Sequence, residues 1–201
     1  MFDTIPSDEI INKAAAALKA NGIETFVEEN SVAAKQKLFE LIPAGAEIMN
    51  NTSATFDSIG ATEEILNSGK YHPVRKKLMD PNIEPKQKSI LGATADYSTG
   101  SVHAITEEGT LMIASNTGSQ LGSEAYPSPH VVYVVGAQKI VKDREEGFKR
   151  IYEHSLPLEE QRMKKLRGPG VTSNVSKVLI INKEVNPDRI KLILVKEVLG
   201  F

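Results

Sequence analysis

The amino-acid sequence predicts one three-layer α/β domain, in which helices cover both faces of a mostly parallel β-sheet. The chain has 201 residues and is 40% hydrophobic, which is enough for one substantial core. Helical and β patterns alternate along its whole length, without a linker or low-complexity segment, so residues 1–201 are expected to form a single domain. The apolar, valine-rich run 131–135 is typical of a strand buried on both faces.

The first elements follow from caps and breakers. Ser7 is placed to cap a helix that ends at Asn21-Gly22, and a strand is expected over 23–27. A second helix begins at Ser31, and the next strand covers 46–49. Residues 50–55 then form a polar turn into a helix, which is the arrangement of an anion site.

The middle and end of the chain continue the alternation. Prolines interrupt 71–85, which predicts a loop or broken helix, and its cations face either solvent or a ligand (Arg75, Lys76, Lys77, Lys86 and Lys88). A hairpin with Gly109 in a left-handed turn precedes the buried strand 131–135. Helices are expected over 143–154 and from Pro157, followed by closing strands at 178–181 and 190–195.

Charge and composition exclude several classes of protein. The formal net charge is −2 and the pI is near 6.1, so no basic field favours nucleic acid or an anionic membrane. The absence of cysteine excludes a thiolate nucleophile, cysteine-bound zinc and a self-ligated iron–sulfur cluster. Neither a signal peptide nor a membrane-spanning run is recognisable, so we expect a cytoplasmic protein.

Most motifs of known chemistry are missing. The sequence contains neither a dinucleotide fingerprint nor a phosphate-binding P-loop, and Gly118-Ser119-Gln120-Leu121-Gly122 does not have the spacing of a nucleophile elbow. The histidines lie at no metal-ligand spacing. His103 and Glu107 are four residues apart, but a hydrogen-bonded structural histidine is favoured over a metal site.

The segment 98–122 carries the densest polar pattern. Thr-Gly-Ser occurs at 99–101 and again at 117–119, on either side of the pair Glu107 and Glu108. Each tripeptide combines a glycine with two hydroxyl side chains, which suits a turn that holds a phosphate or carboxylate. The alternative interpretation is an ordinary hairpin between two polar turns. Because residues 51–53 and 118–119 both follow predicted strand ends, we expect them to converge on one pocket.

Several runs together resemble the LUD domain, a family named for lactate utilisation. They are Ala95-Asp96-Tyr97, 104–111, the strand 131–135 with Lys139-Ile140-Val141, Asn51-Thr52-Ser53, 156–159 and Leu199-Gly200-Phe201. The resemblance covers essentially the whole chain. It implies the Rossmann-like α/β/α sandwich that ribose-phosphate isomerases, glucosamine-phosphate deaminases and CoA transferases share.

The resemblance also implies where a site lies. Sugar-phosphate enzymes of this fold bind phosphate at the loop that matches 50–55. CoA transferases use a glutamate in a Glu-x-Gly turn, which places Glu107 at the nucleophile position. The candidate ligand-binding residues are therefore Asn50, Asn51, Thr52, Ser53, Thr99, Gly100, Ser101, Gly109, Thr110, Thr117, Gly118, Ser119 and Gln120.

Three functions follow from the resemblance. The first is binding of a small anionic metabolite, phosphorylated or carboxylate, at the carboxyl ends of the strands, in organic-acid metabolism of the lactate type. The second is acyl or CoA transfer, or sugar-phosphate isomerisation, centred on Glu107, with a CoA thioester as the implied donor. The third is a non-catalytic scaffold that docks onto an iron–sulfur or flavin redox partner. No intrinsic cofactor or metal is expected.

Overall fold

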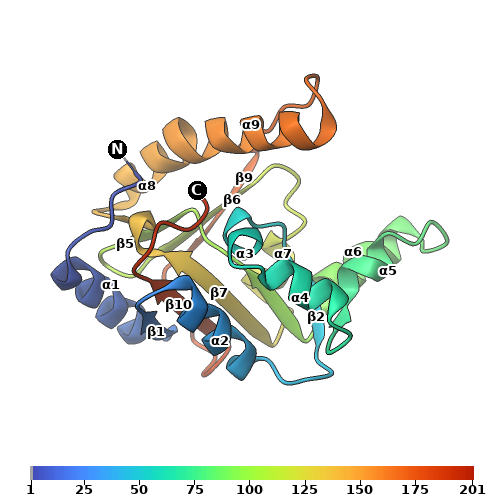
Figure 1. Cartoon of the computed structure of the whole chain (residues 1–201), viewed down its shortest axis with the longest axis horizontal. Helices are drawn as coiled ribbons and strands as arrows, with labels where there is room; N and C mark the ends of the chain where they lie inside the picture. Colours follow the sequence, from blue (N-terminus) through green and yellow to red (C-terminus); the bar gives the residue numbers. More distant parts are fainter. Residues whose placement is uncertain (1) are drawn as a thin grey trace.

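A six-stranded parallel sheet forms the centre of the computed structural model, which describes residues 2–201 (Figure 1). Every neighbouring pair of strands in this sheet is parallel. The strands, in spatial order, are β1 (Glu24–Glu28), β10 (Ile190–Val195), β7 (His130–Gly136), β4 (Tyr97–Gly100), β2 (Glu47–Asn50) and β3 (His72–Pro73). The valine-rich run lies in β7, between β4 and β10, and is buried as predicted.

A smaller second sheet covers part of one face of the first. Its strands are β8 (Ile140–Val141), β5 (Ala104–Thr106), β6 (Leu111–Ser115) and β9 (Lys177–Ile181). Strands β5 and β6 form the predicted hairpin, whose turn requires Gly109 at φ +79°, where a Cβ would lie 2.6 Å from the carbonyl carbon of Ala17. Strand β9 pairs antiparallel with β6, so it belongs to this sheet and not to the main one.

Helices surround the two sheets. They are α1 (Asp8–Ala20), α2 (Ser31–Leu41), α3 (Ala54–Ser58), α4 (Ala61–Asn67), α5 (Val74–Leu78), α6 (Pro85–Thr94), α7 (Leu121–Ala125), α8 (Arg144–Arg150) and α9 (Leu156–Arg167), with a 3₁₀ turn at Ala137–Lys139 and a π-helical turn at Ile151–Ser155. None of the described helices is long and apolar enough to cross a membrane.

The core has a layer on each side of the main sheet. On one face, Val132 and Ile193 pack with Leu38 of α2 and Ile65 of α4. The other face packs against α1 and the inner side of the small sheet, and the outer side of the small sheet packs against α8 and the π-helical turn. The predicted α/β class, with a mostly parallel sheet covered on both faces, is confirmed; the small sheet adds a layer that the sequence pattern does not separate.

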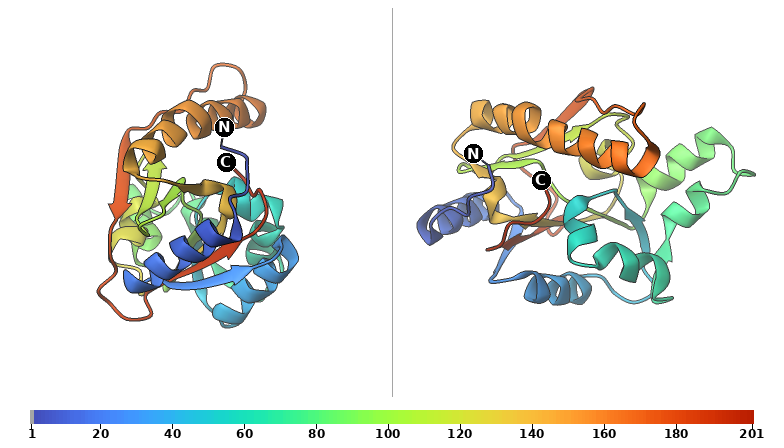
Figure 2. Two further views of the ribbon diagram at one scale, coloured as in Figure 1. Left: turned by 90° about the vertical axis from the view of Figure 1, so that its left-hand side faces the viewer. Right: turned by 45° about the horizontal axis from the view of Figure 1, so that its top comes forward.

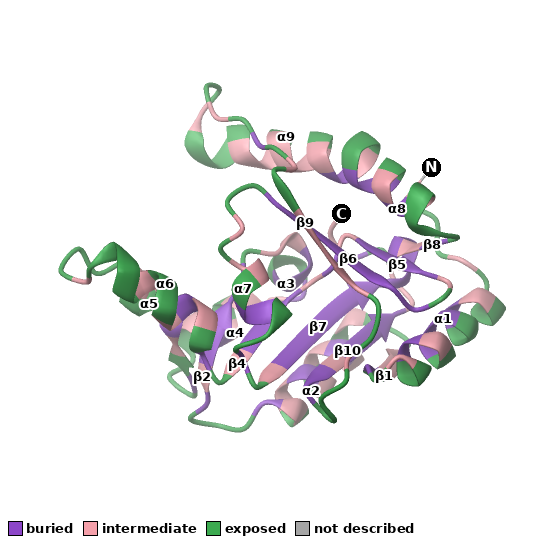
Figure 3. Cartoon of the chain, turned by 180° about the vertical axis from the view of Figure 1, so that it is seen from behind, coloured by how far each residue is buried: buried purple, intermediate pink, exposed green. Residues whose placement is uncertain are grey.

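Two helical regions frame the carboxyl ends of the main strands. Helices α5 and α6 project from the side of β2 and are mostly exposed (Figures 1 and 3). The loop or broken helix predicted over 71–85 contains α5, and α6 is a further helix that the sequence analysis does not predict. Helix α8 runs through the π-helical turn into α9, and α9 lies along one side of the molecule in both views of Figure 2. The sequence predicts two separate helices here; the π-helical turn joins them, and Pro157 is accommodated in the first turn of α9.

Candidate functional site

A cavity of about 510 Å³ lies at the carboxyl ends of β2 and β4, and it also contacts the segment that follows β7. The loop 50–55 after β2 and residues 101–103 after β4 line one part of it. Residues 114–117 at the end of β6, Glu124 of α7 and one face of α9 line the rest. This is the edge of a parallel sheet at which ligands are expected.

Lys139 places a buried amino group in this cavity without a negative partner. The residue is 2% exposed, and its Nζ donates to Thr55 Oγ1 at 3.1 Å, Ser101 Oγ at 3.2 Å and the Val102 carbonyl oxygen at 3.2 Å. All three partners are neutral oxygens. Burial holds the pKa of Lys139 well below its ordinary value, and the nearby charge of Arg150 acts in the same direction.

Arg150 is a second buried cation close to Lys139. It is fully buried at the end of α8 and donates to the His103 carbonyl oxygen and to Ser155 Oγ. Burial lowers its pKa to about 10, so it stays charged at neutral pH. Its Nε and Nη2 atoms have no hydrogen-bond partner among the described residues. Two buried basic side chains, Lys139 and Arg150, thus lie close together, and hydrogen bonds to neutral oxygens hold both of them.

Arg75 reaches the same cavity from α5. Its Nη2 donates to Thr52 Oγ1 at 2.6 Å, which orients the loop after β2. Of the other cations of this run, Lys76, Lys77 and Lys86 are exposed and Lys88 is partly exposed, and none of them lines the cavity. The sequence left open whether this run faces solvent or a ligand, and the structure separates Arg75 from the rest.

Glu124 is the opposite case, a buried carboxyl group without a cation. It is 1% exposed, and its Oε1 accepts a hydrogen bond from Asn51 Nδ2 at 3.2 Å. Its Oε2 has no partner among the described residues. Burial raises the pKa of Glu124 to about 8, and the hydrogen bond from Asn51 opposes this only in part. The group is therefore mostly protonated at pH 7.

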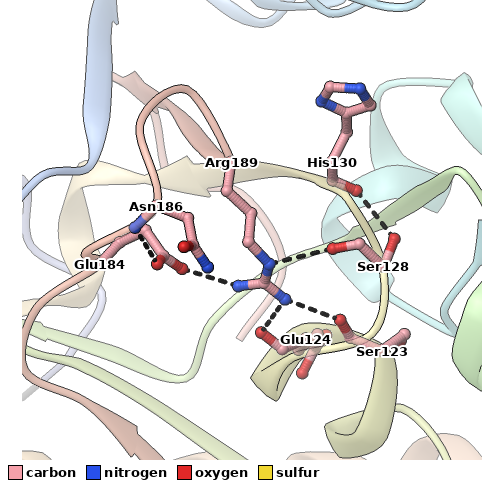
Figure 4. A network of polar contacts seen from close by, with 7 residues as sticks. All are labelled: Ser123, Glu124, Ser128, His130, Glu184, Asn186 and Arg189. Atoms are coloured by element: carbon pink, nitrogen blue, oxygen red, sulfur yellow. Dashed lines mark hydrogen bonds and ion pairs between the residues drawn. The ribbon is translucent and has the colours of Figure 1, made fainter.

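Arg189 fixes the helix that carries Glu124 (Figure 4). Its guanidinium donates to the carbonyl oxygens of Ser123 and Glu124, each at 3.1 Å, and to that of Ser128 at 3.0 Å. Its remaining contact is an ion pair with Glu184 at 2.7 Å, in which both side chains are almost fully buried. Helix α7 has only five residues, so these contacts supply the rigidity that its own length does not.

His103 lines the cavity as a neutral imidazole. Its Nδ1 accepts a hydrogen bond from the backbone N–H of Ala114 at 3.1 Å, so its proton is on Nε2. Burial and the charges of Lys139 and Arg150 lower its pKa to about 3. Residues 2–201 contain no cluster of three metal-ligating side chains. The expected hydrogen-bonded histidine is thus present.

The structure brings together most of the predicted ligand-binding residues. Those that line the cavity are Asn50, Asn51, Thr52, Ser53, Ser101, Thr117, Ser119 and Gln120. Thr99 and Gly100 lie directly behind it at the end of β4, where Thr99 Oγ1 donates to Asn50 Oδ1 at 3.3 Å. Gly118 does not line the cavity, but its N–H donates to Ser115 Oγ at 2.9 Å within the same turn.

Glu107, Gly109 and Thr110 lie elsewhere, at the turn at the far end of the β5–β6 hairpin. This turn packs against α1, and Glu107 Oε2 forms an ion pair with Lys13 Nζ at 2.6 Å. Neither Glu107 nor its two neighbours line the cavity. The glutamate that the resemblance points to therefore lies outside the cavity at the strand ends.

The residues with the most perturbed environments were not predicted as site residues. In the sequence, Lys139 is visible only as part of the run Lys139-Ile140-Val141. A lysine just after the end of a buried strand is nevertheless a signal of a ligand site, because ligands bind at the carboxyl ends of parallel strands. Glu124 and Arg150 carry no such signal, because only the tertiary packing buries them.

A second hollow of about 440 Å³ lies between α2, α3 and α4. Its lysine is already satisfied, since Lys35 Nζ lies 3.2 Å from Glu64 Oε2 and donates to the Gly60 carbonyl oxygen at 3.2 Å. Unmatched charge thus distinguishes the cavity at the strand ends.

Comparisons with known proteins agree with this architecture. The family model of the LUD domain matches residues 11–195. A crystal structure of a DUF162 family protein from Deinococcus radiodurans is similar in fold, with a TM-score of 0.56, 13% sequence identity, and coverage of 94% of this chain and 99% of that one. No match was found among curated proteins. Since the family model covers most of the chain, the protein belongs to the LUD domain family.

Proposed function

We propose that the cavity binds a small anionic metabolite, whose carboxylate or phosphate group contacts Lys139. The observation that carries this proposal is a buried lysine amino group whose three hydrogen-bond partners are all neutral oxygens. A buried charge without a counter-charge is costly, and an anion in the cavity supplies the missing partner. The family is named for lactate utilisation, which fits a role in organic-acid metabolism.

The surroundings of Lys139 favour an anion over a neutral ligand. Ser101 Oγ accepts from Lys139 and donates only a long hydrogen bond, of 3.5 Å, to the Val102 carbonyl oxygen, so its hydrogen can turn toward a bound oxygen. Arg150 adds positive charge from behind, and Arg75 adds it at the loop after β2. The pair Arg162 and Glu159 on α9 is internally neutral, with contacts of 2.7 and 2.9 Å. The excess charge near Lys139 is therefore positive.

Substitution of Lys139 tests the proposal. Native mass spectrometry of the purified protein should detect a retained anionic metabolite, and titration calorimetry with lactate and with glycerol 3-phosphate should show which anion binds. We expect Lys139→Met to weaken the binding by about 100-fold, the usual order for loss of a buried charged partner. Lys13→Met is the matched control, because Lys13 is exposed and pairs only with Glu107.

Proton linkage provides a second readout. An anion beside Lys139 raises the pKa that burial has lowered, so binding takes up a proton at a pH between the free and bound values. Calorimetry in buffers of different ionisation enthalpy should detect this uptake in the wild-type protein and not in Lys139→Met. Equal affinity of wild type and Lys139→Met for both anions contradicts the proposal.

The other two functions gain no comparable support. Acyl or CoA transfer through Glu107 requires a substrate beside a carboxylate that is paired with Lys13 and lies outside the cavity. Docking onto an iron–sulfur or flavin partner, and a cytoplasmic location, stay predictions from the sequence.

A further inference from the structure

The carboxyl group of Glu124 has one oxygen in use and one unused. Oε1 accepts from Asn51 Nδ2, which also donates to Ser98 Oγ at 3.1 Å. Glu124 lines the cavity, and its Oε2 is buried and has no partner among the described residues. An unpartnered buried oxygen is costly, so its position beside a cavity points to a ligand that completes it.

We propose that Oε2 of Glu124 donates a hydrogen bond to a hydroxyl or carbonyl oxygen of the ligand whose anionic group contacts Lys139. This inference rests on the proposed function and narrows it. The ligand class becomes anions that carry a further neutral oxygen, such as hydroxy acids, oxo acids or phosphorylated polyols. Plain carboxylates and alkyl phosphates lack that oxygen and leave Oε2 unpaired.

The groups around Glu124 are consistent with a protonated donor. Strand β4 presents the neutral Ser98, and β7 contributes Tyr133, whose hydroxyl has no partner and whose pKa burial raises well above its ordinary value. The one cation at α7 is Arg189, and its charge is matched by Glu184. No described cation forms an ion pair with Glu124, so the hydrogen bond from Asn51 offsets only part of the cost of ionising it.

The carboxyl group is also held in place, as a specificity contact requires. Arg189 holds the backbone of Ser123 and Glu124. The Asn51 and Glu124 side chains lie against Gly100 of β4, where a Cβ would be in ordinary contact, 3.4 Å from Asn51 Cβ and 3.6 Å from Glu124 Oε1. A donor in a fixed position discriminates ligands that differ by a single oxygen.

Paired probes test the inference separately from the proposed function. Lactate is compared with propanoate, and glycerol 3-phosphate with propyl phosphate, so each pair differs in its hydroxyl groups and not in its anion. We expect the wild-type protein to prefer the hydroxylated member of the series that it binds by about tenfold, the order of one hydrogen bond. Glu124→Gln keeps a donor and should keep the preference, whereas Glu124→Ala should bind both members equally.

Each outcome has one meaning. If wild type binds both members of a pair equally, or if the preference survives in Glu124→Ala, the Glu124 contact is wrong while the Lys139 proposal stands. If wild type binds neither member of either pair, the proposed function itself fails. A thermal unfolding transition for each variant confirms that it is folded.

The pH dependence supplies a check that a merely structural role does not mimic. Above the pKa of about 8, Glu124 loses the proton that it donates and adds a negative charge beside the anion. We expect the preference of the wild type to decline from pH 7 to pH 9, and that of Glu124→Gln to stay constant. The wild-type protein should also show the infrared band of a protonated carboxyl group at pH 7, and Glu124→Gln should lack this band. If the wild-type protein lacks the band, the proposal is wrong.

Discussion

Two glutamates at opposite ends of the small sheet illustrate how environment decides chemistry. Glu107, in the hairpin turn, is partly exposed and paired with Lys13 at 2.6 Å. Glu124, beside the cavity, is buried without a cation and keeps its proton to a pH of about 8. The first lies in the more conspicuous sequence motif, yet the second has the altered protonation that functional carboxyl groups show. Burial and charge matching, and not motif density, separate them.

The largest effect is expected from removing Arg189, which holds the backbone of the helix that carries Glu124. Arg189→Met leaves Glu184 buried and unpaired and three backbone carbonyl groups without a donor. We expect the free energy of unfolding to fall by about 3–5 kcal/mol. Chemical denaturation measures this change. Arg144→Met on α8 is the control, because Arg144 is exposed and donates only to Asn182, and a loss as large there breaks the argument.

The protonation of Glu124 is the next test. The folded protein holds this proton up to a pH of about 8, whereas the unfolded chain releases it above the ordinary pKa of 4.5. The contribution of Glu124 to stability therefore declines as pH rises through this window. Glu124→Gln should match wild type near pH 4.5 and be more stable by about 2–3 kcal/mol at pH 7.

Glu107→Gln is the matched control for that measurement, because it makes the same chemical change in an exposed ion pair. It should give no comparable gain between pH 4.5 and pH 7. A similar gain in both variants removes the distinction between the two glutamates.

The smallest expected effect concerns His103. The folded protein keeps this imidazole neutral down to a pH of about 3, whereas the unfolded chain takes up a proton below its ordinary pKa of 6.5. Stability is therefore lost as pH falls, by about 2 kcal/mol at pH 5. His103→Gln should lack this loss in acid denaturation curves. His72→Gln, at an exposed position, should retain it.

The sequence predicted the scaffold better than the site because the scaffold depends on local patterns. The cap at Ser7, the turn at Gly109 and the valines of β7 act over a few residues, and the structure has each of them where the sequence predicts it. The helix predicted from Asp143 begins one residue later, with Asp143 as its N-cap. The separation of β9 into a second sheet depends on which distant strand it pairs with, and a period-two pattern does not contain that information.

The polar loops of the site were predictable because they follow strand ends, which place residues 50–53 and 117–120 at one edge. The buried ionisable residues of the site were not predictable from the sequence. Burial of Glu124 and Arg150 depends on contacts with Asn51, His103 and Ser155, which are distant in the chain or on another turn of helix. The Glu-x-Gly motif of CoA transferases pointed to Glu107. A three-residue motif identifies a turn, but it does not show whether that turn faces a cavity.

The π-helical turn at Ile151–Ser155 determines which side of α9 lines the cavity. Each helical residue advances the chain by about 100°, so removing one residue from this turn rotates the whole of α9 by that angle. Leu156, Glu159 and Met163 would then leave the cavity together, and a different set of side chains would replace them. A single-codon insertion or deletion at this point is thus a route by which evolution can exchange the α9 residues that line the cavity while the main sheet stays unchanged. The same change would displace Ser155, which holds the Arg150 side chain.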